Sequence, residues 1–418
     1  MEKIRSIKAR EILDSRGLPT IEAKLKLSSG IEVFAQVPSG TSTGKREALE
    51  LRDGGEQFFG MGVKKAVKNI NEKINKAIKG KIVSRQKEID ELLIELDGTE
   101  NKSFLGANAI LATSIAVCRG GARAKKMPLW KYINYLFKKI STNKKIKPKI
   151  PKPCLLLIEG GLHSGCGLDF QEFMIVPSKE SFKENLEEGV KIYYSLKEIL
   201  ERKYGKIATN VGLEGAFAPP IEKAEKALDL IVWASKNKKI KIIIDAAASH
   251  FYKKSFYEVE NSIFTSHGLL KFYLELCQIY PILGIEDPFS EEDWEGFSSL
   301  LKEKNDIFVI GDDLLVSNLK LIKKAEKRKA CNGVVLKVNQ IGTVWEALEA
   351  ASFAQSRGWQ VFVKHRSGET CDDFIADLSV GIGCGWIMSG APTRGERVAK
   401  YNRILEIEEE EFKRYKLL

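Results

Sequence analysis

The run Gly-Val-Val-Leu-Lys-Val-Asn at residues 333–339 places one cation, Lys337, inside a strand of otherwise apolar residues. Burying an ammonium group in such a strand is costly unless the group is paired. Three earlier apolar runs end on acids instead, at 242–245 (Ile-Ile-Ile-Asp), 283–287 (Leu-Gly-Ile-Glu-Asp) and 308–313 (Phe-Val-Ile-Gly-Asp-Asp). Strands that end on carboxylates, beside one that carries a buried lysine, predict a divalent cation held next to a base.

Short apolar runs of strand length recur through the second part of the chain. They lie at 154–158, 172–176, 241–245, 283–286, 307–311, 333–338, 360–364 and 386–389. Amphipathic helical patterns, such as 182–204 and 269–280, separate most of them. Strands alternating with helices in this number predict an α/β fold with a (β/α)8-type barrel rather than an open doubly wound sheet. In such a barrel the chemistry gathers at the carboxyl ends of the strands, where the acids and Lys337 fall.

The first part of the chain has a different pattern. Residues 1–36 alternate like an antiparallel meander, and helical periodicity then runs from about 63 to 136. We therefore predict an N-terminal α+β capping domain at 1–137, a linker rich in lysine and proline at 138–152, and a barrel domain at 153–418. The polar stretch 38–44 is predicted to be a mobile loop over the site, with an ordinary polar turn as the alternative.

The chain carries a surplus of positive charge, which raises the question of an anionic partner. The chain has 67 Lys and Arg against 56 Asp and Glu, a formal net charge of +11. Lysines crowd 64–87, 138–152 and 236–241, and we interpret the surplus as a solvated surface. A nucleic-acid partner is not expected, because no basic motif with interleaved aromatic residues supports one.

Cysteine usage and hydropathy point to one compartment. Seven cysteines without a C-x-x-C pair give neither a disulfide framework nor a zinc site. No apolar run approaches the ~18 residues that span a bilayer, and the N-terminus lacks the apolar core of a signal peptide. We expect a cytoplasmic protein with no membrane partner.

The acids and the lysine each have an ordinary structural explanation as well. An acid after a strand often caps the next helix, and a lysine on an edge strand extends to solvent. Three acids on separate strands, with a buried lysine on the next, make coincidence the weaker interpretation. Asp245, Glu286 and Asp312 offer the hard oxygen ligands that Mg²⁺ prefers.

Seven segments, taken in order along nearly the whole chain, resemble the enolase family. They are 9–17 (Ala-Arg-Glu-Ile-Leu-Asp-Ser-Arg-Gly), 37–44 (Val-Pro-Ser-Gly-Thr-Ser-Thr-Gly), 105–111 (Leu-Gly-Ala-Asn-Ala-Ile-Leu), 171–175 (Gln-Glu-Phe-Met-Ile), 285–289 (Ile-Glu-Asp-Pro-Phe), 336–342 (Leu-Lys-Val-Asn-Gln-Ile-Gly) and 365–370 (His-Arg-Ser-Gly-Glu-Thr). Some of these segments are weak individually, but the order and the separations make the set specific.

The resemblance implies a hydro-lyase that reversibly dehydrates 2-phosphoglycerate to phosphoenolpyruvate in glycolysis and its reverse. It implies two Mg²⁺ per active site, one conformational and one catalytic. By this match Lys337 takes the C2 proton and Glu214 protonates the leaving hydroxyl, with Glu172 beside it. The other implied residues are the first-metal ligands Asp245, Glu286 and Asp312, the second-metal ligand Ser42, the phosphate contacts Arg366 and Ser367, and the pocket residues Gln171, His163 and His365. Burial and nearby cations are expected to lower the pKa of Lys337.

One departure from the family pattern removes a charge. Met388 stands where the family has a second active-site lysine that contacts the substrate carboxylate. Losing one partner of a buried charge pair costs about 2–5 kcal/mol, or roughly two to four decades in rate, so reduced activity is expected. Lys364 replaces the usual serine ahead of His365, and we hypothesise that it partly restores the missing charge. Because it alternates with His365 along a strand, an outward orientation is the alternative.

Other departures concern the acid and the oligomer. Leu213 replaces an acidic neighbour of Glu214, and Leu156 and Glu159 stand where the family has asparagines. Enolases commonly dimerise through a contact that pairs a glutamate, here Glu22, with a late arginine. Glu406 takes that arginine's place and would repel Glu22 unless Arg403 substitutes for it; on the resemblance we still expect a homodimer.

Two rival functions stay open beside the leading one. The first is an inactive enolase-fold protein that binds partners through its basic surface. The second is a lyase for a different phosphorylated hydroxy acid, with a pocket reshaped around Leu213 and Met388. The retained pair Arg366 and Ser367 favours a small phosphorylated substrate for either enzyme.

Overall fold

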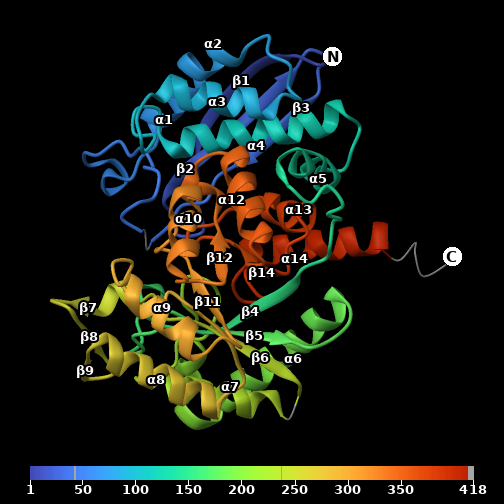
Figure 1. The fold of residues 1–418 in the computed structure, drawn as a ribbon. Helices are drawn as coiled ribbons and strands as arrows, with labels where there is room; N and C mark the ends of the chain where they lie inside the picture. The colour runs from blue at the N-terminus through green and yellow to red at the C-terminus, as the bar shows by residue number, and fades with distance from the viewer. Residues whose placement is uncertain (42–43, 237, 413–418) are drawn as a thin grey trace.

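The N-terminal part of the chain folds around an antiparallel sheet. The computed structural model of the protein describes residues 1–41, 44–236 and 238–412 (Figure 1). The sheet has the order β1-β2-β3, with β1 at Ile4–Leu13, β2 at Pro19–Leu27 and β3 at Glu32–Gln36. Ala23 lies opposite Ala9 on one side and Ala35 on the other, which confirms the predicted meander.

Helices lie against this sheet because its strands present one apolar face. Ile21, Ala23 and Leu25 alternate along β2 and are fully buried. The helices are α1 (Lys64–Asn69), α2 (Asn75–Ile78), α3 (Gln86–Asp97), α4 (Ala107–Ala124) and α5 (Leu129–Ile140), and a π-helical turn at Ile70–Ile74 joins α1 to α2. The long α4 contacts both β2 and β3 and is buried along most of its length.

The second part of the chain forms a closed barrel. Around the barrel the strands follow the order β10-β11-β12-β13-β14-β4-β5-β6. Their bounds are β4 Lys152–Glu159, β5 Glu172–Pro177, β6 Ile240–Asp245, β10 Ile282–Glu286, β11 Phe308–Gly311, β12 Gly333–Leu336, β13 Gln360–Lys364 and β14 Trp386–Met388. Each strand predicted for the barrel coincides with one of these, so the barrel prediction is confirmed.

One strand runs against the others. β5 pairs antiparallel with both β4 and β6, and Glu172 lies opposite Glu159 and Asp245. Between β4 and β5 the chain has only a loop with a short 3-10 turn at Gly161–His163, which agrees with the expectation that helices separate most but not all of the strands. The reversal has a consequence for the site, because the first residue of β5 lies at the edge where the neighbouring strands end.

Helices surround the barrel and a small sheet extends from it (Figure 1). The helices are α6 (Phe182–Tyr204), α7 (Ala224–Ser235), α8 (Ser266–Ile279), α9 (Trp294–Glu303), α10 (Leu319–Arg328), α11 (Val338–Ile341), α12 (Val344–Ser356), α13 (Phe374–Gly381) and α14 (Gly395–Ile407). The extra sheet consists of β7 (Tyr252–Lys253), β8 (Phe256–Val259) and β9 (Ser262–Phe264). Among the described residues no helix combines the length and the apolar character needed to cross a membrane.

The N-terminal part touches the barrel where β13 ends. Ser39 and Gly368 exchange two backbone hydrogen bonds, with N···O distances of 2.8 and 2.9 Å. On α4, Arg119 pairs with Asp372 and, at 2.9 Å, with Asp373 of the barrel. These contacts hold the described part of the predicted loop beside the segment that follows β13.

Candidate active site

The strand ends bring the predicted acids to one edge of the barrel. Asp245 is the last residue of β6 and lies in register with Glu286, the last residue of β10. Asp312 directly follows β11, and Lys337 directly follows β12. Because parallel strands in register end at a common edge, residues far apart in sequence become neighbours there. The acids do not cap the following helices α9 and α10, which are capped by Asp293 and Asn318.

Lys337 is buried and paired with an acid. It directly follows β12, which lies between β11 and β13 in the closed barrel, so the edge-strand explanation is ruled out. Its ammonium forms an ion pair with the carboxylate of Asp312. The expectation of a lowered pKa is wrong here. Burial is the largest effect and lowers the pKa of Lys337, but the nearby acids, Asp312 foremost and Glu286 after it, raise it, and the net result is a raised pKa.

Lys364 points into the barrel. Its Nζ lies 2.7 Å from Glu286 Oε1, 2.9 Å from Asp245 Oδ2 and 3.0 Å from Glu172 Oε2, and the residue is 3 % exposed. The alternative of an outward orientation is therefore wrong. Strand alternation does not separate Lys364 from His365, because β13 ends at Lys364 and His365 already belongs to the following loop.

Glu214 lies between two histidines. Its Oε2 is 2.9 Å from His365 Nε2, and its Oε1 is 3.4 Å from His163 Nδ1. Burial lowers the pKa of His163 to about 4 and that of His365 to about 3, so both imidazoles are neutral near pH 7. Arg397 Nη1 lies 2.6 Å from His365 Nδ1, which must then accept, so the ring proton on Nε2 faces Glu214.

Glu172 completes this side of the pocket. Its Oε1 is 3.7 Å from His163 Nδ1, and burial raises its pKa to about 8. A carboxyl group with such a pKa holds its proton near neutrality. Gln171, the residue before it, places Nε2 3.4 Å from Asp245 Oδ2, so both predicted pocket residues of this segment lie at the site.

Arg366 and Ser367 lie on the opposite side, next to the N-terminal part of the chain. Arg366 Nη1 donates to Glu47 Oε2 at 2.8 Å and to Asn339 Oδ1 at 3.2 Å. Ser367 Oγ accepts a hydrogen bond from Thr41 N at 2.8 Å. No local pattern singles out Glu47, because only the folded chain brings its loop to Arg366.

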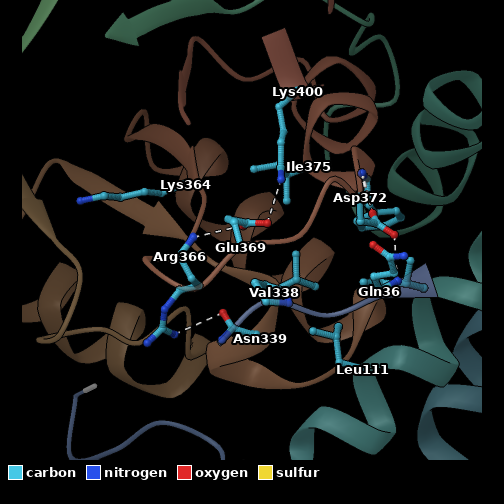
Figure 2. A pocket seen from close by; sticks show the side chains of 13 residues that line it. Gln36, Leu111, Val338, Asn339, Lys364, Arg366, Glu369, Asp372, Ile375 and Lys400 are labelled. Atoms are coloured by element: carbon cyan, nitrogen blue, oxygen red, sulfur yellow. Dashed lines mark hydrogen bonds and ion pairs between the residues drawn. The ribbon is translucent and has the colours of Figure 1, made fainter. Parts of the chain in front are cut away.

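A small cavity of about 20 Å³ lies between the two parts of the chain beside Arg366. Figure 2 shows Gln36 and Leu111 lining it from the N-terminal side, and Asn339 and Arg366 from the barrel side. In the same view Lys364 extends away from the side of the cavity that Gln36 occupies. Lys364 thus contacts the acids inside the barrel, whereas Arg366 contacts Glu47 of the N-terminal part.

Glu159 is a buried acid that the sequence reasoning noted only as a departure. It ends β4, is fully buried, and accepts hydrogen bonds from Glu214 N at 3.1 Å and Ala216 N at 2.9 Å. Burial raises its pKa well above the usual value. Glu159 therefore holds the backbone of the loop that presents Glu214. The signal was available, since an acid at the end of an apolar run is the same feature that singled out Asp245.

The carboxylate oxygens fit a hard divalent cation. Asp245, Glu286 and Asp312 offer only oxygen donors, and the described chain gives Glu286 Oε2 no hydrogen-bond partner. Among the described residues, two groups bring ligand atoms within 4.8 Å of one another; they are His163 with Glu172 and Glu214, and Asp287 with Asp312 and Asp313. Asp245, Glu286 and Asp312 together do not form such a group. Ser42, the predicted ligand of a second metal, lies outside the described residues.

Comparison with known proteins gives a consistent result along the whole chain. The sequence models of two families, "Enolase, N-terminal domain" and "Enolase, C-terminal TIM barrel domain", match residues 4–133 and 147–416. A protein named "Enolase" from Methanopyrus kandleri is 47% identical over 420 residues, covering 98% of this chain and 96% of its own. "Enolase B" of Dictyostelium discoideum is 49% identical, covering 97% and 95%, and "Enolase" of Methanocaldococcus jannaschii is 48% identical, covering 98% and 95%.

The chain belongs to the enolase family.

Two positions that depart from the family pattern, Met388 and Leu213, carry apolar side chains at this site. Met388 is 1 % exposed and lies in register with Lys364 on the adjacent strand, so an apolar side chain and a cation end neighbouring strands. The carbonyl oxygen of Leu213 accepts a hydrogen bond from Arg397 Nη2 at 3.1 Å, and its apolar side chain places no charge next to Glu214.

The residues considered for dimer contacts are paired within this enolase-family chain. Arg10 Nε lies 2.7 Å from Glu22 Oε1. Arg403 lies 2.8 Å from Asp377 and 2.6 Å from Glu406. Arg403 is thus paired with Glu406 within the chain, and the dimer contact stays a prediction.

Proposed function

We propose that this enolase-family chain catalyses the reversible dehydration of 2-phosphoglycerate to phosphoenolpyruvate, as a Mg²⁺-dependent hydro-lyase of glycolysis and its reverse. One observation carries the proposal: the carboxyl edge of one barrel brings together a buried lysine, a glutamate that contacts the His365 imidazole, and carboxyl groups at the ends of neighbouring strands. The names and the coverage of the relatives support the same activity.

In this proposal Lys337 is the base that removes the C2 proton. Its position after β12, inside the mouth of the barrel, supports the role. To accept a proton, the ammonium must first lose its own, and its ion pair with Asp312 opposes that loss. Anything that takes over the Asp312 carboxylate therefore makes Lys337 a better base.

Glu214 is the proposed acid for the leaving hydroxyl. The Nε2–H of His365 and the backbone support from Glu159 orient its carboxyl group toward the pocket. Glu172 and His163 line the same side and belong to both the catalytic and the substrate-binding set. With a pKa of about 8, raised by burial, Glu172 keeps a proton available there near neutrality.

Arg366 and Ser367 are proposed to hold the phosphate, with Gln171 lining the pocket. A guanidinium group recognises phosphate with two parallel hydrogen bonds, and the planar fork of Arg366 already binds the Glu47 carboxylate in this way. A phosphate would replace Glu47 as its partner.

Asp245, Glu286 and Asp312 are the proposed ligands of the first Mg²⁺, and Ser42 of the second. Bound Mg²⁺ supplies positive charge that stabilises the negative charge developing on the substrate carboxylate. The chain's own contribution is to hold three carboxylates on neighbouring strands at one edge. The number of ions, two per site, is part of the proposal.

The proposal extends to the compartment, the oligomeric state and the domain division of the protein. Free cysteines, including the exposed Cys371, favour a reducing cytoplasm. We also propose a homodimer, on the family resemblance, and a domain division at the linker 138–152, on its lysine- and proline-rich composition. Analytical ultracentrifugation at several concentrations tests the dimer, and a monomer throughout would reject it.

Absorbance-monitored formation of phosphoenolpyruvate from 2-phosphoglycerate with Mg²⁺ tests the function. The wild type and Met388→Lys are compared, since that variant restores the lysine of the family pattern. Turnover by the wild type supports the proposal, and we expect Met388→Lys to be at least as active. Turnover by the variant alone indicates a chain that has lost the activity. Absence of turnover in both rejects the proposal and favours another phosphorylated hydroxy acid or a binding role.

A further inference from the structure

Lys364 Nζ is surrounded by three carboxylates from three different strands. Each lies at hydrogen-bond distance, between 2.7 and 3.0 Å, and they belong to Glu172, Asp245 and Glu286. An ammonium group has three N–H donors, so this cluster satisfies all of them. Lys364 is the last residue of β13, across the barrel from β6 and β10 in the strand order, and its side chain reaches the acids through the interior.

The ammonium offsets the repulsion among these acids. Asp245 and Glu286 end adjacent strands in register, and both are at least 98% buried, with exposures of 2% and 0%. Buried like charges at such spacing destabilise a protein unless a cation lies among them. The register partner of Lys364 is Met388, which brings no charge. Among the described residues of these two adjacent strand ends, Lys364 alone supplies the cation.

The same oxygens are the ones proposed to bind metal. Lys364 uses Asp245 Oδ2 and Glu286 Oε1, while Glu286 Oε2 has no hydrogen-bond partner within the described chain. Mg²⁺ requires oxygen ligands at about 2.0–2.1 Å in near-octahedral geometry. An ammonium bonded to those oxygens would place a second positive charge next to the ion, and the two cations would repel each other.

We infer that the Lys364 ammonium and a divalent cation compete for the carboxylate oxygens of Asp245 and Glu286, which makes Lys364 a determinant of metal affinity in this chain. The inference rests on the proposed function, which assigns these acids as Mg²⁺ ligands. Glu172, the third partner of Lys364, is not among those ligands. Its Oε2, 3.0 Å from Lys364 Nζ, offers the displaced ammonium a carboxyl oxygen to remain on, so metal binding breaks two of the three contacts.

Calorimetric titration with Mg²⁺, without substrate, tests the competition directly. Lys364→Ser and Lys364→Met remove the ammonium, and each is expected to bind Mg²⁺ about tenfold more tightly than the wild type, the scale of an ordinary coupling between two ligands. The matched control is Lys102→Met, because Lys102 is also buried but pairs with Glu346, 3.1 Å away, outside the site. The control should keep the wild-type affinity.

Unchanged or weaker Mg²⁺ binding by folded Lys364 variants would overturn the inference. If the variants do not fold, a crystal of the wild type soaked in Mn²⁺ decides it, because anomalous scattering locates the ion. An ion on Asp245 and Glu286 with Lys364 Nζ moved off both supports competition. An ion bound there with Lys364 still on both oxygens rejects it.

The two hypotheses fail in different ways. If the wild type binds Mg²⁺ and forms phosphoenolpyruvate, but the Lys364 variants keep its affinity, only the competition is wrong. If the wild type and both variants bind no Mg²⁺ and form no phosphoenolpyruvate, the proposed function is wrong and the competition falls with it.

Discussion

Lys337 and Lys364 stand at the ends of two adjacent barrel strands, β12 and β13, and have different proposed roles. Both are buried, both follow or end a barrel strand, and both are ion-paired. Lys337 has one carboxylate partner, Asp312, and can be released by anything that takes that partner. Lys364 has three partners and is held much more firmly. We therefore assign the proton transfer to Lys337.

Lys337→Met should remove the base while keeping the length of the side chain. We expect kcat to fall by about 10²–10⁴-fold, the usual contribution of a general base. KM should change little, because the proposed phosphate contacts are untouched. Steady-state kinetics with 2-phosphoglycerate measure both, with Lys102→Met as the control for loss of a buried lysine. A variant that retained more than about a tenth of wild-type kcat would exclude Lys337 as the base.

Asp90 gives a pH prediction that is independent of the site. It is buried on α3, accepts from Trp345 N at 2.9 Å, and burial raises its pKa from 3.8 to about 7. At a pH between these two pKa values, Asp90 is protonated in the folded protein but ionised in the unfolded chain. This group therefore lowers the free energy of unfolding as pH rises from about 4 to 7, by at most about 1.4 kcal/mol per pH unit.

Asp90→Asn should flatten that pH dependence. The amide carries no titrating proton, and Gln86 Oε1, which has no partner in the described chain, can accept from it. Urea unfolding of both proteins at pH 5 and pH 7 measures the difference. We expect the wild type to lose more stability than Asp90→Asn over this interval. Equal losses would mean that Asp90 does not titrate there.

At the scale of elements, the described part of the loop 38–44 packs closely against the segment that follows β13. The described part of the loop is bonded to the segment after β13 through Ser39 and Thr41. Gly40 faces Arg366 so closely that a Cβ built on it would lie 1.8 Å from Arg366 Nη2. Only a residue without a side chain allows this approach. That the loop moves is still a prediction.

Gly40→Ala should therefore displace the Arg366 guanidinium or the loop itself. We expect KM for 2-phosphoglycerate to rise by about tenfold or more, since a charge-assisted contact contributes about 1.5–3 kcal/mol. Gly30→Ala is the control for substituting a glycine, because a Cβ there meets no atom within 4 Å. Gly30 has a positive φ, so the control reports strain without contact. An unchanged KM in Gly40→Ala would mean that Arg366 does not hold the substrate.

At the scale of the whole molecule, the N-terminal part and the barrel share the site. Arg366 of the barrel pairs with Glu47 of the N-terminal part, and Arg119 on α4 pairs with Asp372 beyond the barrel mouth. Burial lowers the pKa of Arg119, but Asp372 and Asp373 outweigh it and the pKa is raised. Docking of the two parts is therefore supported by partly buried ion pairs as well as by apolar packing.

Arg119→Ala should leave the buried Asp372 without its main counter-charge. Removing one partner of a buried pair costs about 3–5 kcal/mol, so we expect a loss of unfolding free energy of this order in urea. Arg123→Ala, one helical turn along α4 and exposed, is the control and should change stability by less than about 0.5 kcal/mol. A similar small change in both variants would show that the junction does not depend on Arg119.

The barrel, the N-terminal meander and the acids at the strand ends were all predictable from the sequence. Their signals are local: alternation fixes a strand, and an acid that ends an apolar run is at a strand end wherever the strand goes. Glu159 carried the same signal. The roles of Glu214, Arg366 and Ser42 came from the family resemblance and stay predictions.

Only the tertiary structure decided which charges meet. The direction of Lys364 depends on where β13 ends, the raised pKa of Lys337 depends on Asp312 from another strand, and the pairing of Arg366 with Glu47 depends on docking of the two parts. The physical reason is that periodicity is a property of neighbours along the chain. Electrostatic energy depends on distances across the barrel, and closing the sheet sets those distances.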